Sequence, residues 1–343
     1  MNDFEALLAQ YDYTLTKELI ALTPAEPRDS AKLLIFERAK NIVTYSSFAN
    51  LADFIPKGAL MVFNDTKVIP ARLSTNKKTG GVVEILCTEI DETQNTCIAL
   101  SNKRIAKGEV LSIGKTEITV LRTEGSYYTL EFDTNIMETI EHLGITPIPP
   151  YLKYTPLTEE KLRERYQSLF AKNKGSIAAP TASLHFTEEL FNKLSKKGVN
   201  LAHITLHVNL GTFSPLTKSA IYENKLHCEN FSISAEAAEK INAAKKARMP
   251  IIAVGTTAAR TLESAAESDG SIKEQNGKTR LFIRAGYRFK VIDGLITNFH
   301  VPRSSLLMLV SALVGRKKLF ELYKNAADHD FRFLSFGDGM LII

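Results

Sequence analysis

The chain has 343 residues, of which 44% are hydrophobic and 24% charged, with 18 glycines and 12 prolines. This composition is that of an ordinary globular protein and excludes disordered, collagen-like and low-complexity classes. The net charge of +5 is unevenly distributed: residues 1–150 carry 15 basic and 20 acidic side chains, whereas residues 151–343 carry 28 and 18. The resulting −5 and +10 indicate a polyanionic partner for the C-terminal part, unless the excess is a chance fluctuation in solvated charge.

Cysteine usage and hydropathy narrow the class further. Three cysteines without a CxxC pair argue against a disulfide framework, a cysteine-rich zinc site or an iron–sulfur cluster. The first residues show no basic and apolar signal pattern, and no 18-residue apolar window occurs. We therefore expect a soluble, cytoplasmic protein with no membrane association and no metal.

Residues 61–150 have the pattern of a small antiparallel β-barrel or sandwich. Short β-rich runs recur every 8–12 residues between turn signals, at Val82–Glu89, Thr96–Leu100, Glu109–Ile113, Glu117–Arg122 and Tyr127–Phe132. Residues 151–343 instead alternate strand and helix patterns, and residues 1–60 also mix the two. The predicted fold class is therefore α/β: a larger, barrel-like α/β catalytic domain (1–60 plus 151–343) interrupted by an inserted β-barrel domain (61–150).

The elements predicted in the second part follow in chain order. Thr187 begins a helix with acidic residues in its first turn, and Leu201–Leu210 follows as a strand. Helix Ala235–Arg248 precedes strand Ile251–Val254, and another helix opens at Thr256. We further predict a hairpin of residues 280–284 with 287–292, a strand at Leu295–Phe299, and a helix that begins at Ser304-Ser305 and ends at Gly315.

Common nucleotide and metal motifs fail on direct inspection. The only G-x-G, at Gly337, lies too close to the C-terminus for a phosphate-binding helix to follow it. His203 and His207 are four residues apart, but the period-two pattern around them predicts a strand, which separates them by roughly 13 Å. They cannot share one metal ion. Their polar stripe belongs either to a half-exposed strand or to the wall of a cleft.

Three segments could carry chemistry. Gly255-Thr256-Thr257, with Arg260 a turn later, begins a helix suited to an anion, although plain N-capping is the favoured interpretation of this segment taken alone. Asn298 to Ser305 brings an imidazole, a guanidinium and a helix start into one loop. Residues 175–186 are rich in small residues and could wrap a ligand with their backbone. A structural role is the alternative for each segment.

Taken together, the arrangement of these blocks resembles one family. The blocks include Asp12-Tyr13-Thr14-Leu15, Phe63-Asn64-Asp65-Thr66-Lys67-Val68-Ile69-Pro70-Ala71-Arg72-Leu73, Ala178-Ala179-Pro180-Thr181-Ala182, Leu184-His185-Phe186-Thr187, Thr205-Leu206-His207-Val208, Val254-Gly255-Thr256-Thr257, Asp293-Gly294-Leu295-Ile296-Thr297-Asn298-Phe299-His300 and Phe336-Gly337-Asp338. They run in order over nearly the whole chain and resemble the S-adenosylmethionine:tRNA ribosyltransferase-isomerases of queuosine synthesis. Ser183 and Asn209 depart from the pattern by standing where glycine is expected, and Ala258-Ala259 replaces a Ser-Val pair.

The resemblance implies transfer and isomerisation of the ribosyl part of S-adenosylmethionine onto 7-aminomethyl-7-deazaguanine at the tRNA wobble position. Epoxyqueuosine forms, adenine and methionine leave, and no cofactor beyond S-adenosylmethionine as co-substrate is expected. The implied partners are S-adenosylmethionine and the tRNA anticodon loop that carries this base. A non-catalytic RNA-binding protein and a metal-dependent hydrolase are the rival interpretations.

The candidate residues follow from the matched blocks. Base and acid candidates, not assigned individually, are His185, His207, His300 and Asp293. Substrate-binding candidates are Thr181, Phe186, Thr212, Phe213, Thr256, Thr257, Arg260, Asn298 and Phe299. Among them, Thr256, Thr257 and Arg260 could hold either the methionine carboxylate or an RNA phosphate, and the phenylalanines could stack on a base. Candidates for RNA phosphate contacts are Lys153, Arg288, Lys290 and Arg303.

Overall fold

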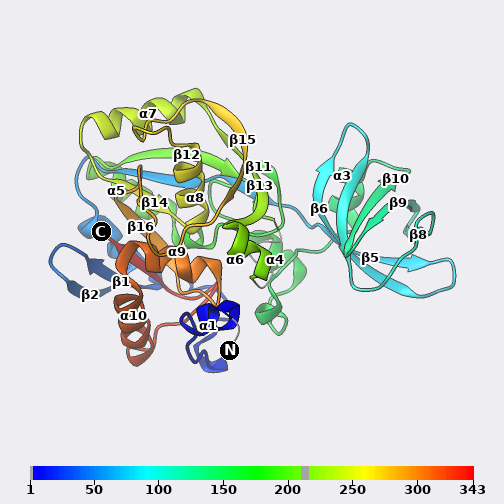
Figure 1. The fold of residues 1–343 in the computed structure, drawn as a ribbon, viewed down its shortest axis with the longest axis horizontal. Helices are drawn as coiled ribbons and strands as arrows, with labels where there is room; N and C mark the ends of the chain where they lie inside the picture. The colour runs from blue at the N-terminus through cyan, green and yellow to red at the C-terminus, as the bar shows by residue number, and fades with distance from the viewer. Residues whose placement is uncertain (1–2, 210–215) are drawn as a thin grey trace.

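The structure, a computed structural model, describes residues 3–209 and 216–343. A nine-stranded mixed sheet forms its larger part, in the order β15-β13-β12-β3-β14-β16-β17-β1-β2 (Figure 1). In that order the strands are Gln275–Leu281, Lys225–Ile233, Asn200–Leu206, Leu60–Asn64, Ile251–Val254, Gly294–Asn298, Gly339–Ile342, Lys32–Glu37 and Ile42–Ser47. The central strands β12, β3, β14 and β16 are mutually parallel, so their carboxyl ends lie along one edge of the sheet.

Helices cover both faces of this sheet because its central strands are apolar on both sides. Alternate strand residues pack into two cores: Val62, Ala253 and Leu295 belong to one, and Phe63, Val254 and Ile296 to the other. The first core is closed by α7 (Ala235–Lys246), α8 (Thr256–Ala265), α9 (Ser305–Val314) and α10 (Arg316–Asp328). The second is closed by α2 (Leu51–Phe54) and α5 (Glu188–Lys196).

A closed antiparallel barrel stands apart from this sheet (Figure 1). Its strands are β5 (Arg72–Lys77), β6 (Val82–Asp91), β7 (Thr96–Ser101), β8 (Val110–Ile113), β9 (Thr116–Glu124) and β10 (Tyr127–Phe132). Helix α3 (Ile136–Leu143) packs Ile136 and Ile140 into the barrel core. A two-stranded parallel sheet, β4 (Thr66–Val68) with β11 (Asn173–Ser176), lies where the chain passes between the two parts.

The remaining elements are short. They are the helices α1 (Asp3–Ala9), α4 (Glu159–Arg165) and α6 (Lys218–Glu223), with 3-10 turns at Lys17–Leu19, Arg28–Ser30, Phe48–Asn50, Pro150–Leu152 and Thr181–His185. Among the described residues, no helix has the length and apolar character needed to cross a membrane.

The α/β class and the small antiparallel barrel are confirmed, and all five predicted barrel strands form. The larger sheet, however, is not barrel-like: it is open and has two edge strands, β15 and β2. Among the sheets of the described residues, the six-stranded one is the closed barrel. The proposed barrel insertion must also begin later than residue 61, because residues 61–64 belong to β3 at the centre of the large sheet. Their complete burial explains this placement, since a strand buried on both faces suits the sheet centre.

One predicted element of the α/β part is wrong and another is shorter than predicted. Residues 287–292 form no strand, because the backbone N–H groups of Lys290, Val291 and Ile292 donate to the buried carboxylate of Glu263 instead of to a partner strand. The strand predicted to Leu210 ends at Leu206. Beyond it, Val208 leaves the sheet and exchanges hydrogen bonds with the loop at Ser176 and Ile177.

The predicted helix starts are confirmed. The hydroxyl of Thr187 accepts a hydrogen bond from the backbone N–H of Leu190, and that of Ser304 accepts one from Leu307. These contacts satisfy N–H groups that the first turn of a helix leaves without an internal partner.

Candidate active site

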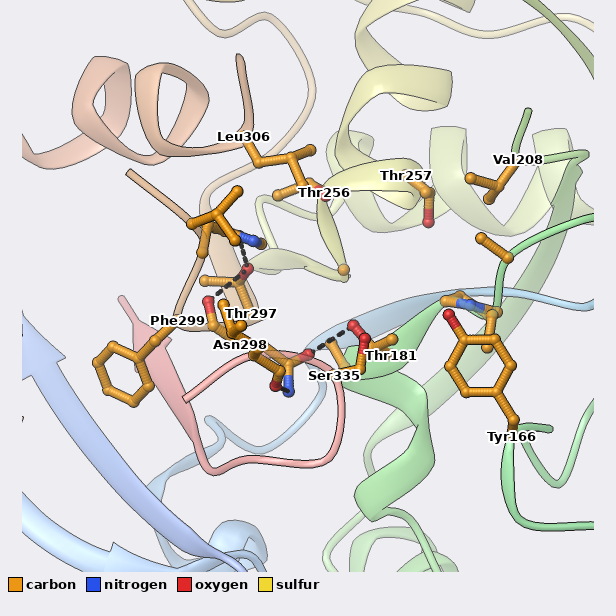
Figure 2. Close-up of a pocket in the computed structure, with 18 of the residues that line it drawn as sticks. Tyr166, Thr181, Val208, Thr256, Thr257, Thr297, Asn298, Phe299, Leu306 and Ser335 are labelled. Atoms are coloured by element: carbon orange, nitrogen blue, oxygen red, sulfur yellow. Dashed lines mark hydrogen bonds between the residues drawn. The ribbon is translucent and has the colours of Figure 1, made fainter. Parts of the chain in front are cut away.

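A pocket opens at the carboxyl ends of the parallel strands β14 and β16, beside the start of α8 (Figure 2). Ligands of open α/β sheets bind at this edge, where loops leave the strands. The pocket holds about 760 Å³ of space, part of it open to solvent. Its walls are Tyr151, Tyr166, residues 178–182, Val208, residues 255–257, Arg260, residues 297–301, Leu306, Leu334 and Ser335.

The first turn of α8 forms one wall. Gly255 is its N-cap, with φ of 93°, a backbone conformation that side-chain-bearing residues rarely adopt. No side chain caps the helix, and the buried hydroxyl of Thr257 has no hydrogen-bond partner among the described residues. Thr256 and Thr257 therefore do not serve as ordinary N-caps, and the N-terminus of α8 stays available to a ligand.

Arg260 lies one turn along α8 and forms a buried ion pair. Its Nη1 contacts the Glu229 carboxylate at 2.5 Å, and its Nε donates to the Leu281 carbonyl at 3.3 Å. Glu229 also accepts a hydrogen bond from the backbone N–H of Asn209 at 3.1 Å. The remaining nitrogen, Nη2, is buried without a partner in the described part of the chain. The ion pair therefore fixes the guanidinium and leaves one donor unused.

Asn298 joins three segments at the pocket floor. Its Oδ1 accepts from the Thr181 hydroxyl at 2.9 Å, a contact seen in Figure 2. Its Nδ2 donates to the Leu334 carbonyl at 3.2 Å and lies 3.3 Å from His185 Nε2. His185 does not line the pocket; it stacks on Phe48 with ring centroids 4.2 Å apart. His185 therefore reaches the pocket through Asn298.

His300 lines the pocket itself. Its Nε2 lies 2.8 Å from the Thr297 hydroxyl, which also contacts the Asn298 carbonyl at 3.3 Å. If the single hydroxyl proton goes to that carbonyl, Nε2–H must donate to the hydroxyl, which leaves Nδ1 as the ring's proton acceptor. The backbone of residue 300 is held separately, by Tyr13 at 2.6 Å and Tyr323 at 2.8 Å.

His300 in the pocket and His185 behind it are both neutral near neutral pH. Burial lowers the pKa of His300 to about 3. The pKa of His185 is also lowered to about 3, mainly by burial and further by the positive charges of Arg332 and Arg28. A neutral imidazole is the form able to accept a proton, so near neutral pH His300 is in the basic form.

These two histidines predict a pH-dependent stability. An unfolded histidine has a pKa near 6.5, so between about pH 3 and about pH 6.5 the unfolded chain binds more protons than the folded one. The contribution of each histidine to the free energy of unfolding is therefore fully present above about pH 6.5. It decreases by about 1.4 kcal/mol for each unit by which the pH is lowered within that window. Urea unfolding at about pH 5 and about pH 7.5 measures the fall. His300→Gln should show a shallower fall; an equal fall would contradict the assignment.

Several sequence candidates lie outside this pocket or do not face it. The Phe186 ring is fully buried and packs against Phe63 and Phe191, so it belongs to the core. Phe299 is at the pocket wall, but its ring points away from the other labelled residues (Figure 2) and stacks on Phe333 at 4.5 Å. Neither ring is placed to stack on a base.

The other two acid–base candidates do not line the pocket. Asp293 precedes β16 at its opposite end, where its carboxylate accepts from the Ile251 backbone N–H at 2.9 Å. His207 faces a second cavity, between the barrel and the α/β part, and its Nδ1 lies 2.8 Å from the Thr66 hydroxyl. The substrate candidates Thr212 and Phe213 lie outside the described residues.

The four cationic candidates differ in their surroundings. Lys153 is exposed two residues after the pocket residue Tyr151 and lies over the ring of Tyr154, which is 79% exposed. Arg288 and Lys290 are also exposed. Arg303 instead contacts the carboxylates of Glu5 and Asp12 at 3.3 and 3.4 Å, which ties its guanidinium to the N-terminal segment. Lys153 is therefore the candidate that closely follows a pocket residue and forms no ion pair in the described part of the chain.

Sequence reasoning missed two tyrosines and a serine of the pocket. The Tyr151 hydroxyl lies 2.7 Å from that of Ser335, and burial raises the pKa of Tyr151 to about 12. Tyr166 is buried beside them. Ser335 directly precedes the Phe336-Gly337-Asp338 block, which was the one available signal. Nothing in the local pattern around either tyrosine distinguishes it from a core residue.

Comparison with known proteins places the chain in a family. The sequence profile of the family described as queuosine biosynthesis protein matches residues 8–342. The chain belongs to this family. A relative from Fusobacterium nucleatum, named S-adenosylmethionine:tRNA ribosyltransferase-isomerase, is 44% identical over 98% of this chain and 96% of its own length. A relative of the same name from Carboxydothermus hydrogenoformans is 45% identical over 98% and 99%.

A solved structure agrees with this membership in the queuosine biosynthesis family. The crystal structure of S-adenosylmethionine tRNA ribosyltransferase from Thermotoga maritima aligns with a TM-score of 0.56 and 32% identity, covering 97% of this chain and 100% of that chain. The predicted resemblance is thus confirmed. Three blocks that carried it, at residues 178–182, 254–257 and 293–300, all contribute to the pocket walls.

Proposed function

We propose that the pocket at β14, β16 and α8 binds S-adenosylmethionine and is where its ribosyl group passes to a tRNA base. The enzyme class, S-adenosylmethionine:tRNA ribosyltransferase-isomerase, follows from the family and the relatives' shared name. The finer proposal is that the acceptor is 7-aminomethyl-7-deazaguanine at the wobble position. Epoxyqueuosine is then the product, and adenine and methionine leave.

The observation that carries this proposal is the convergence of family blocks on one partly enclosed pocket. The walls of this one pocket combine apolar side chains, an amide, a neutral imidazole and an open helix N-terminus. The reaction draws on each kind of group. An amide can orient the ribose, the imidazole can move a proton, and helix N–H groups can hold an anion.

We assign the acid–base role to His300. The positive sulfur of S-adenosylmethionine acidifies the adjacent carbon, and a base must remove a proton there. His300 is neutral, and Nδ1 is its acceptor when the Thr297 hydroxyl donates to the Asn298 carbonyl, so it is the group placed to take that proton. The lowered pKa makes the imidazole a weak base but its protonated form a strong acid, which suits return of the proton to departing adenine. His185 acts as a positioning residue through Asn298. His207 and Asp293 are left out because neither lines the pocket.

The anticodon loop must approach the pocket so that the flipped wobble base can enter. We propose Lys153 for contact with the RNA phosphates, and Arg288 and Lys290 as further contacts. Tyr154, exposed beside Lys153, offers a ring on which a splayed base can stack. A tRNA substrate also agrees with the cytoplasmic location expected from the sequence.

Lys153→Ala is expected to weaken tRNA binding at low salt and to reduce the slope of log K against log salt by about one unit. The reason is that one fewer phosphate-bound cation releases one fewer counterion. Filter binding across a salt series measures the slope. Lys273→Ala is the control, since Lys273 is exposed and paired with Glu267. An unchanged slope for Lys153→Ala would remove this residue from the interface.

The proposed activity is tested by incubating the protein with S-adenosylmethionine and tRNA that carries the 7-aminomethyl-7-deazaguanine base. Nucleoside mass analysis should then show epoxyqueuosine, with adenine and methionine released in equal amounts. No metal or further cofactor is added, because the proposed steps need only proton transfer and displacement at carbon. Release of adenine without a modified nucleoside would contradict ribosyl transfer.

A further inference from the structure

Three unused hydrogen-bond donors belong to the first part of α8, which lines the pocket. The Thr257 hydroxyl and Arg260 Nη2 are both buried with no partner among the described residues. The third is the uncapped N-terminus of α8, a ten-residue helix whose N-cap is Gly255. A buried donor without an acceptor costs free energy, so the folded protein keeps these groups unpaired only if something else compensates them.

The geometry of Arg260 limits what can compensate it. Nη1 is bound to Glu229 and Nε to a backbone carbonyl, so the guanidinium cannot turn toward solvent. Arg260 is only 7% exposed and the ion pair lies in the interior. Arg260 lines the pocket, so an acceptor that enters the pocket can satisfy this nitrogen. A small anion suits it best, because a guanidinium and a helix N-terminus both favour negative charge.

We propose that these donors bind the α-carboxylate of the methionyl part of S-adenosylmethionine. The inference rests on the proposed function and decides between the two anions that the sequence left open. An RNA phosphate carries a nucleoside on each side, and such a chain cannot reach a guanidinium that is only 7% exposed. A terminal carboxylate has no such neighbours and can accept from the hydroxyl, Nη2 and the helix N–H groups together.

The site would also orient the reaction. Held at the start of α8, the methionyl group occupies the β14 side of the pocket, and the ribose and adenine extend along the wall formed by Thr297, Asn298 and His300. Loss of the carboxylate contacts should therefore weaken S-adenosylmethionine binding without removing the groups proposed to do chemistry.

The test uses decarboxylated S-adenosylmethionine, which lacks only this carboxylate. Calorimetry should show that the wild-type protein binds S-adenosylmethionine about tenfold or more tightly than the decarboxylated ligand. Thr257→Val removes the hydroxyl at nearly constant volume and should weaken binding of S-adenosylmethionine but not of the decarboxylated ligand. Arg260→Lys, which keeps the charge opposite Glu229 but loses the second nitrogen, should narrow the preference as well.

Thr261→Val is the matched control. Thr261 lies one turn further along α8, and its hydroxyl donates to the Thr257 carbonyl at 3.0 Å, outside the pocket lining. The Thr261→Val protein should prefer S-adenosylmethionine over the decarboxylated ligand by the same factor as the wild type. Equal wild-type affinity for the two ligands, or a loss in Thr257→Val that is the same for both, would overturn the carboxylate site. Failure of the wild type to bind either ligand would instead count against the proposed function.

Discussion

His300→Gln is expected to lower the single-turnover rate of ribosyl transfer by about 10²- to 10⁴-fold, the range typical for loss of a positioned acid–base group. Glutamine can keep a polar contact with the Thr297 hydroxyl but cannot accept a proton at neutral pH. Affinity for S-adenosylmethionine should fall much less than the rate, because the groups proposed to bind its carboxylate lie on α8. Rapid-quench analysis of adenine release measures the rate, and calorimetry the affinity.

The His300→Gln variant should fold, because the contacts of Tyr13 and Tyr323 are to the backbone of residue 300 and do not depend on its side chain.

His142→Gln is the control, since His142 is exposed in the last turn of α3 on the barrel. The parallel variant His185→Gln separates the two roles. A positioning residue that acts through Asn298 should change the rate less than His300→Gln does. A rate for His300→Gln within a factor of two or so of wild type would exclude it as the acid–base group.

Glu229→Ala is expected to reduce the free energy of unfolding by about 3–5 kcal/mol, the cost of leaving a buried charge without its counter-ion. Glu229 and Arg260 are 2% and 7% exposed, so water cannot replace the lost carboxylate. The backbone N–H of Asn209 loses the same acceptor. Urea unfolding followed by circular dichroism measures the change.

Two further variants show whether burial is the cause. Glu236→Ala breaks the exposed pair with Lys240 on α7 and should change stability little, because surface ion pairs are screened by water. The double variant Glu229→Gln with Arg260→Met should recover much of the loss, since it removes both charges from the interior. A loss for Glu229→Ala no larger than that for Glu236→Ala would show that the pair is not desolvated.

How far the site could be foreseen differs from residue to residue. Asn298 and His300 line the pocket, and their block was singled out because a strand end that leads into a helix start predicts polar groups at a sheet edge. Asp293 was included from the same block, yet five strand residues place it at the other end of β16. Phe186 and Phe299 could not be distinguished from ligand-stacking rings, because burial of a ring depends on which distant residues pack around it.

Local patterns were sufficient for most of the fold and insufficient where the partner lies far along the chain. Barrel strands and capped helices are predictable because alternation, turn residues and capping hydroxyls act within a few residues. The predicted hairpin at 287–292 failed because its backbone donors bind Glu263, more than twenty residues away. The same holds for β3, whose place at the centre of the large sheet depends on pairing with β12 and β14.

The sequence by itself determined the family, the α/β class with a small barrel, and the concentration of positive charge in residues 151–343. Only the tertiary structure decided which histidine lines the pocket and which donors remain unpaired there. The physical reason is that burial, ion pairing and pocket shape are properties of segments brought together from distant parts of the chain. Arg260 illustrates this, because its free Nη2 depends on Glu229, thirty-one positions earlier in the sequence.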